Sequence, residues 1–203
     1  MVCRRPIVAI LAVCLTAAVE LGAFQRYSKL HGDRFQSKLT RIVIFGSTPA
    51  APGRTAGQTT EVTDEELNSY LRFHAGDQIP AGIVEPTLSA LGDGKVGGHV
   101  IVDLDAVRKQ KQRGWLDPMG YLAGKLPVTA RGTLTTKDGV GQFALESAEV
   151  SGIAVPKTLI QELLTHYSRT PENPTGINMD APFELPSRIR EIRVGKAQST
   201  IVQ

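Results

Sequence analysis

Residues Leu126–Val150 read LPVTARGTLTTKDGVGQFALESAEV and carry the clearest strand and turn pattern of the sequence. Its first part alternates, with Val128, Ala130, Gly132 and Leu134 on one side and Thr129, Arg131 and Thr133 on the other. A period of two is typical of a strand with one buried face. Lys137-Asp138-Gly139 turns the chain back, and Asp-Gly between alternating runs is a strong hairpin signal. We therefore expect Leu126–Thr136 to pair with Gln142–Val150.

The residues after this hairpin predict a helix and a second pair of strands. Pro156 is suited to the first turn of a helix over Lys157–Tyr167. A polar loop over 168–179 follows, and then Phe183-Glu184-Leu185-Pro186 leads into a strand through Ile189, Ile192 and Val194. Gly195-Lys196-Ala197 makes a turn into a terminal strand, Ser199–Gln203.

The residues before the hairpin predict the same order, a helix and then two strands. Thr63 and Glu66 form a capping box that opens a helix running to about Phe73. Strands follow over 83–90 and 95–104, with Leu91-Gly92-Asp93-Gly94 as the turn. Consecutive strands joined by tight turns favour an antiparallel sheet. We expect an α+β domain: a curved antiparallel sheet of about six strands, two main helices packed on one face, and a preceding N-terminal membrane or signal helix.

The N-terminus predicts export from the cytoplasm. Arg4 and Arg5 precede an uncharged run over 7–19, which is the pattern of a signal peptide or signal anchor over 1–23. The run is shorter than the roughly 20 residues that span a bilayer comfortably, so cleavage and anchoring both stay open. Val13 is too large for a lipoprotein site before Cys14. We expect the chain to be anchored in the inner membrane facing the periplasm, or periplasmic if the segment is cleaved.

The next region predicts a connection between membrane and domain. Residues 24–41 are polar and basic with roughly helical spacing, and the apolar run 42–45 fits either helix or strand. Residues 47–60 are rich in Ser, Thr, Pro, Ala and Gly and resemble a flexible linker. We divide the chain into 1–23, a juxtamembrane helix and linker over 24–60, and a single domain over 61–203.

Composition argues against several kinds of function. A net charge of +3 and 5% aromatic residues do not favour nucleic-acid binding. The histidines show no metal-ligand spacing, and both cysteines lie before residue 24. Asp103 and Asp105 share one side of a strand end, which we interpret as a solvated strand end rather than a cation site. No nucleophile motif or phosphate loop is present. We therefore expect no catalytic residues, metal or cofactor.

Two sets of residues are candidates for a site. The apolar stripes of the two helices would line a lipid groove under the sheet, or be ordinary core; they are Leu67, Tyr70, Leu71, Ile160, Leu163 and Leu164. Small residues, Ala130, Gly132, Ala144 and Ala148, would leave space in that groove. A basic run beside the only tryptophan would touch anionic membrane headgroups, or be a solvated surface; it comprises Arg108, Lys109, Lys111, Arg113 and Trp115.

Three short segments resemble the LmeA-like phospholipid-binding family of bacterial envelope proteins. They are the helix opening Val62–Asn68, the strand Leu126–Gly132, and Phe183–Pro186 with the strand through Val194. The resemblance implies half of a tubular lipid-binding fold, a long curled antiparallel sheet around a helix, and no catalytic residues. Residues 167–174 match no pattern of that family.

Two hypotheses of function follow. The first is a non-catalytic envelope protein that binds or shuttles a lipid in an apolar groove between sheet and helices. The alternative is a structural or assembly protein of the envelope with a filled core, whose terminal strand Ser199–Gln203 pairs with a partner protein. An enzyme has the least support, and Asp103 and His99 would be its first residues to test.

Overall fold

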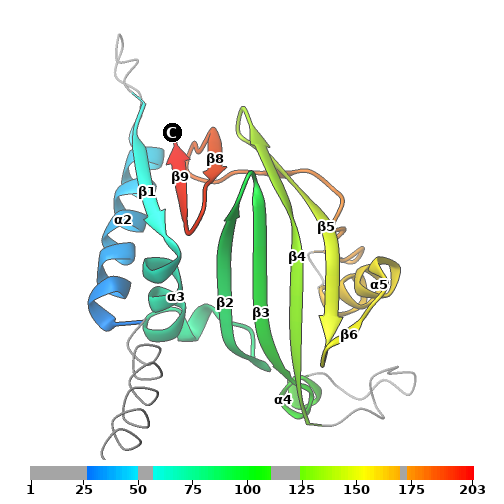
Figure 1. Ribbon diagram of the computed structural model, residues 1–203. Coiled ribbons are helices and arrows are strands. Elements are labelled where there is room, and N and C mark those ends of the chain that lie inside the picture. The colour runs from blue at the N-terminus through cyan, green and yellow to red at the C-terminus, as the bar shows by residue number, and fades with distance from the viewer. Residues whose placement is uncertain (1–26, 50–56, 111–123, 170–172) are drawn as a thin grey trace, which may run out of the picture.

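The protein folds as a large and a small antiparallel sheet with helices beside them (Figure 1). The computed structural model describes residues 27–49, 57–110, 124–169 and 173–203. The large sheet has the order β2-β3-β4-β5-β6, with β7 paired to β5, and comprises β2 (Ile83–Gly92), β3 (Lys95–Asp103), β4 (Lys125–Lys137), β5 (Val140–Val150), β6 (Ile153–Ala154) and β7 (Phe183–Glu184). The predicted α+β class and the antiparallel sheet of about six strands are confirmed.

The large sheet is built from two long hairpins, each closed by an Asp-Gly turn. Asp93 and Gly94 join β2 to β3 with φ angles of 52° and 77°, and Asp138 and Gly139 join β4 to β5 with 50° and 85°. Positive φ at both turn positions gives the twist that a two-residue hairpin needs, and Asp-Gly tolerates it. Both predicted hairpins are confirmed. Within the large sheet the sequence missed the two-residue strands β6 and β7, and outside it the sequence missed β1, whose first residues fall in the predicted linker.

The small sheet has the order β1-β9-β8, from β1 (Thr59–Thr63), β9 (Gln198–Val202) and β8 (Glu191–Val194). The terminal strand β9 is therefore central, and its residues pair with β1 on one side and β8 on the other. The predicted partner edge at Ser199–Gln203 is wrong, because both rows of backbone groups are already used within the chain. Its hairpin turn with β8 agrees with the sequence.

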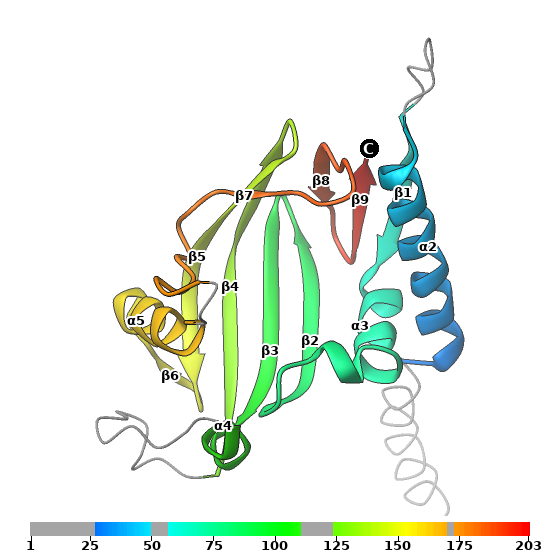
Figure 2. The ribbon, with the colours of Figure 1, turned by 180° about the vertical axis from the view of Figure 1, so that it is seen from behind.

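The helices lie beside the sheets rather than between them. They are α2 (Lys29–Ser47), α3 (Asp64–Phe73), the short 3₁₀ helix η1 (Gly76–Gln78), α4 (Leu104–Gln110) and α5 (Lys157–Tyr167). Figure 2 shows α3 beside β2 and α5 beside β5, at opposite ends of the large sheet. The predicted capping box of α3 is present, with Thr63 Oγ1 accepting from Glu66 N and Glu66 Oε2 accepting from Thr63 N.

The helix α2 packs against α3 and extends the folded unit toward the N-terminus. It includes the apolar run 42–45, and Ile42 is 3% exposed. Phe35 lies on Tyr70 with ring centroids 5.0 Å apart. Gly32 permits the close approach, because a Cβ there would lie 2.7 Å from the His74 ring. The boundary predicted near Glu61 falls inside β1, so the domain is better described as including α2 and β1.

Polar and charged side chains tie α2 to α3. Lys38 Nζ donates to both carboxylate oxygens of Glu66 at 2.7 Å. His31 Nδ1 lies 3.0 Å from Glu65 Oε1, and His74 Nε2 lies 2.9 Å from Asp33 Oδ1. Burial by itself raises the pKa of Glu66, but hydrogen bonds from Lys38 and Thr63 and the charges of Lys38 and Arg34 outweigh it and lower that pKa below 4.5. Glu66 is therefore held ionised at this contact.

Candidate functional site

One face of the large sheet is apolar across four strands. Alternation along each strand and the register between strands determine which residues share a face. Ile83, Val102 and Leu126 are aligned across β2, β3 and β4, and Val128 is paired with Val100 and Val150. We call this the apolar face; its residues are Ile83, Leu88, Ala90, Val96, Gly98, Val100, Val102, Leu126, Val128, Ala130, Gly132, Leu134, Phe143, Leu145, Ala148 and Val150.

Few residues of the apolar face are buried. Only the small Ala90, Gly132 and Ala148 are; the others are half-buried, and Leu88 is 45% exposed. From Leu126 to Leu134 the face extends about 27 Å along β4, and its four strands span about 14 Å. An ordinary core buries its large aliphatic side chains almost completely. The apolar face is therefore accessible along most of its length.

The opposite face of the same sheet is mostly polar. It carries Thr87, Ser89, Lys95, His99, Thr129, Arg131, Thr133, Gln142, Ser147 and Glu149. Ala144 also belongs there, since it is paired with Thr133. Its predicted place in the groove is therefore wrong. The bulge between Arg131 and Gly132 explains the error, because it changes which residues of β5 share a face. Ala130, Gly132 and Ala148 do lie on the apolar face.

The free edge of β2 is closed by side chains of α3. Asn68 accepts from the backbone N–H of Leu88 and donates to its carbonyl oxygen, both at 2.7 Å. The Asp64 carboxylate accepts from the Ala90 N–H at 3.0 Å. Further along, Pro86 has no N–H to offer. These contacts keep another strand from adding to this edge and fix α3 beside the second half of β2.

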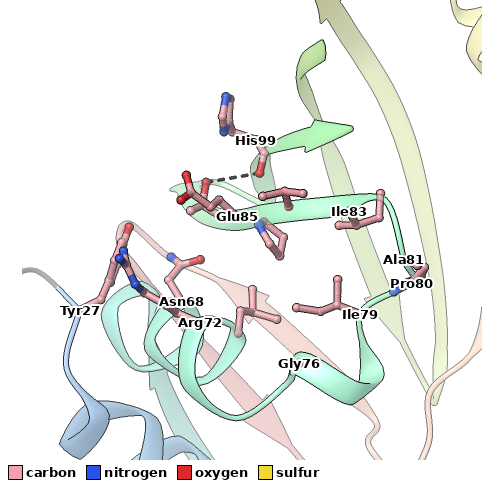
Figure 3. A pocket seen from close by; sticks show the side chains of 14 residues that line it. Tyr27, Asn68, Arg72, Gly76, Ile79, Pro80, Ala81, Ile83, Glu85 and His99 are labelled. Atoms are coloured by element: carbon pink, nitrogen blue, oxygen red, sulfur yellow. Dashed lines mark hydrogen bonds between the residues drawn. The ribbon is translucent and has the colours of Figure 1, made fainter. Parts of the chain in front are cut away.

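A cleft of about 800 Å³ opens beside the first half of β2, where α3 and β2 diverge. Figure 3 shows α3 and η1 on one side of it and β2 on the other. Its polar lining residues Tyr27, Arg72 and Glu85 lie at one end, and Ile79, Pro80 and Ile83 lie at the other. Ile83 belongs also to the apolar face. The cleft therefore has a polar end and an apolar end that meets the large sheet.

The groove residues predicted on α3 lie in different surroundings. Leu71 lines the cleft, and Leu67 is half-buried. Tyr70 is 8% exposed and faces Phe35 of α2. Its hydroxyl accepts a hydrogen bond from Gln78 Nε2. Tyr70 is therefore core between two helices, and the cleft residues Ile79 to Pro86 were missed because they occupy a turn and a bulge without periodicity.

The groove residues predicted on α5 lie at the other end of the sheet. Ile160, Leu163 and Leu164 are half-buried, and Leu163 lines a second pocket of about 420 Å³ on α5. Since α3 contacts β2 and α5 contacts β5, about 14 Å of sheet separates the two helices. The two predicted stripes border a common sheet at its ends and do not face each other across one narrow groove.

The membrane-surface residues are only partly described. Arg108 and Lys109 fall within α4, whose side chains beyond Val107 are outside the described ones, and Lys111, Arg113 and Trp115 lie outside the described residues. Asp103 Oδ1 accepts from the N–H groups of Asp105 and Ala106, so it caps α4. Within the described ranges, no cluster of three or more metal-ligating side chains occurs. No described helix has the length and apolarity to cross a membrane, and the predicted signal segment lies outside these ranges.

Comparisons with known proteins leave the family open. No family model and no curated protein matches the chain. A crystal structure of a lipopolysaccharide binding protein is similar over 77% of this chain, with 15% sequence identity and a TM-score of 0.23. The chain spans 45% of that protein. A similarity at this level decides neither the fold nor the ligand.

Proposed function

We propose that the protein binds a lipid, with its acyl chains along the apolar face of the large sheet. The supporting observation is that Val100, Val128 and Leu134 and the other large residues of this face are only half-buried. Burying an aliphatic side chain fully contributes about 1.5–3 kcal/mol relative to leaving it exposed. The face therefore holds unused hydrophobic free energy that a ligand's chains would release.

The dimensions of the face fit a whole lipid. The hydrocarbon core of a bilayer is about 30 Å thick, so the chains of one leaflet extend about 15 Å. The face, about 27 Å by 14 Å, is longer than one such chain and wide enough for chains lying side by side. The proposal agrees with the resemblance to LmeA-like proteins and with an exported location, both of which stay predictions.

The alternative function, a structural or assembly protein, depended on a free edge of the terminal strand. The terminal strand β9 has no such edge, because it is paired with β1 on one side and β8 on the other. The edge of β2 is also closed, by Asn68 and Asp64. A partner protein would have to cover the apolar face itself, and no charge pattern there selects one. We also propose that the lipid-binding role is non-catalytic.

A filling substitution tests the proposal. Ala130 lies at the centre of the apolar face, and its neighbour Arg131 lies on the opposite face. We expect Ala130→Trp to lower the affinity of the full-length chain for a fluorescent diacyl lipid at least tenfold, because the indole occupies the space of the chains. Arg131→Trp, the matched control, should bind like wild type. Circular dichroism and lipid mass spectrometry accompany the titration. A wild-type chain that neither copurifies with lipid nor exchanges it would refute the proposal.

A further inference from the structure

The cleft between α3 and β2 separates polar from apolar lining along its length. Tyr27, Arg72 and Glu85 occupy one end, and Ile79 and Ile83 occupy the other. Ile83 also stands on the apolar face, whereas Thr87 and His99 line the cleft from the opposite face. A chain on the apolar face would therefore reach the cleft around the edge of β2, at Ile83. Whatever is attached to the chain then comes to lie between Arg72 and Glu85.

The polar end contains two opposite charges, and the Arg72 guanidinium lies 5.9 Å from the centre of the neighbouring Phe73 ring. Arg72 projects from the last turn of α3, and Glu85 projects from β2 across the cleft (Figure 3). No ion pair of either residue occurs in the described part of the chain. A site with one unpaired cation and one unpaired anion is complementary to a ligand that carries both charges.

A bulge in β2 directs Glu85 to this position. The register with β3 shifts between Val84 and Thr87, and Glu85 has a φ of 49°. The left-handed region is costly for a residue with a Cβ. Bulges of this kind re-aim a side chain out of its regular place on the sheet. Pro86, directly after it, supplies no N–H to the edge, so the cleft is not closed there by strand pairing.

From this arrangement we infer that the polar end binds a zwitterionic headgroup in which a phosphate and a primary ammonium lie a few bonds apart, as in an ethanolamine phospholipid. Arg72 donates to the phosphate oxygens, and Glu85 accepts from the ammonium. This inference rests on the proposed lipid-binding function and specifies its ligand class. A trimethylated ammonium has no N–H to donate, and a glycerol headgroup has no positive charge for Glu85.

The expected contribution is selectivity more than affinity. Both groups are exposed, and exposed charge pairs contribute little because water and salt screen them. One such pair changes a binding constant by about fivefold at most. The apolar face supplies most of the affinity, and the polar end chooses among lipids with the same chains. High salt should therefore reduce the preference for ethanolamine and leave the binding of chains intact.

A competition experiment tests the inference with the full-length chain. A bound fluorescent diacyl lipid is challenged with ethanolamine, choline and glycerol phospholipids with identical chains, and with soluble glycerophosphoethanolamine. We expect the ethanolamine lipid to compete about threefold to fivefold better than the other two. The soluble compound, which has no chains, should not displace the probe; displacement by it would overturn the inference that the polar end only chooses among lipids held by their chains. Failure of every lipid to displace the probe would refute the proposed function, whereas equal competition by all three would refute only the headgroup inference.

Three variants assign the two charges. Glu85→Gln should abolish the preference for ethanolamine over choline, and Arg72→Gln should weaken all three phospholipids about equally. The reciprocal double variant R72E/E85R restores both charges in exchanged positions and should recover part of the preference. Thr87→Val, also in the cleft but uncharged, is the control. An unchanged preference in Glu85→Gln, with wild-type circular dichroism, would overturn the assignment of the ammonium site.

Discussion

Two regions of this molecule differ in how completely they bury their side chains. At the end formed by α2, α3 and the small sheet, the buried side chains include Thr60, Glu66, Asn68, Ser69 and Gln203, and Ser69 is 0% exposed. On the apolar face of the large sheet, no large side chain is buried. The protein is therefore packed tightly around α2, α3 and the small sheet, with apolar and polar side chains buried together, and is left open on the apolar face of the large sheet.

The packed end stabilises the fold, and the apolar face contributes little to that stability. At the packed end several buried polar groups have partners: the Gln203 side chain donates to the carbonyls of Ile42 and Ser187, and Ser69 Oγ accepts from Ser28 N. Among the described residues, His31 Nδ1 and His74 Nε2 form no hydrogen bond there but lie about 3 Å from the carboxylates of Glu65 and Asp33. Arg188 adds contacts to the carbonyls of Phe45, Gly46 and Thr48 at the end of α2. A satisfied buried network rigidifies a structure. The apolar face has no such constraint and is free to bind.

Among the variants that separate the two regions, Asn68→Ala should cause the largest loss of stability. The change removes the hydrogen bonds to Leu88 N and O and the one to Asp64 O. It leaves the edge of β2 unsatisfied beneath α3, so we expect a loss of about 2–4 kcal/mol in the free energy of unfolding. Urea denaturation measures it. Asn178→Ala, an exposed control, should change stability by no more than about 0.5 kcal/mol. A small loss for Asn68→Ala would mean that the packed end does not hold the sheet.

The next effect should come from acid acting on Glu66. The pKa of Glu66 is lowered in the folded state, so its ionised form stabilises the fold. This stabilisation is complete above about pH 4.5, the ordinary pKa of the group, and is lost as the pH falls through the lower pKa of the folded state. Glu66→Gln should cost about 1–3 kcal/mol at pH 7 and should remove this part of the acid dependence. Stability curves from pH 7 to pH 3 measure both effects. Glu149→Gln, at an exposed position on the polar face of β5, is the control. Parallel curves for wild type and Glu66→Gln would contradict the prediction.

The sequence predicted the regular parts of this fold and missed the parts that depend on tertiary contacts. Alternation and the Asp-Gly turns located both hairpins, and Thr63 with Glu66 located the start of α3. The position of β9 in the middle of the small sheet depends on pairing with β1, more than 130 residues earlier, and no local pattern records it. The packing of α2 depends on His31, Lys38 and Gly32 meeting residues of α3, which resembles ordinary surface polarity in the sequence.

The sequence predicted an apolar lipid site but placed it between the helices and the sheet rather than on the open face of the sheet. Val128, Ala130 and Leu134 were assigned to one face, yet the helices were expected to form the groove. The openness of the face follows from where α3 and α5 attach, at opposite ends of the sheet, which helical stripes do not encode. Arg72 and Glu85 were missed for a related reason: one is an ordinary helix residue, and the other owes its position to a bulge.

A smaller effect on stability, with a larger one on binding, should follow from Val128→Ala. The side chain is half-buried, so removing two methyl groups from the apolar face should cost about 0.8 kcal/mol or less. The same change removes contacts that form only with the ligand, and we expect the affinity for a diacyl lipid to fall about twofold to tenfold. Urea denaturation and fluorescent lipid titration separate the two effects. A loss near 3 kcal/mol would show that the face is filled core.

The smallest effect should come from Thr129→Ala, one residue further along β4. Thr129 is paired with His99 on the opposite face, so we expect stability to change by no more than about 0.5 kcal/mol and lipid affinity to stay at the wild-type value. Val128 and Thr129 are neighbours on the same strand and share the same adjacent strands, but their side chains point to opposite faces of the sheet. The two variants therefore compare the apolar face with the polar face at one position along β4. Equal losses of affinity in the two variants would show that the lipid responds to the strand as a whole; a loss confined to Val128→Ala places the ligand on the apolar face and nowhere else on β4.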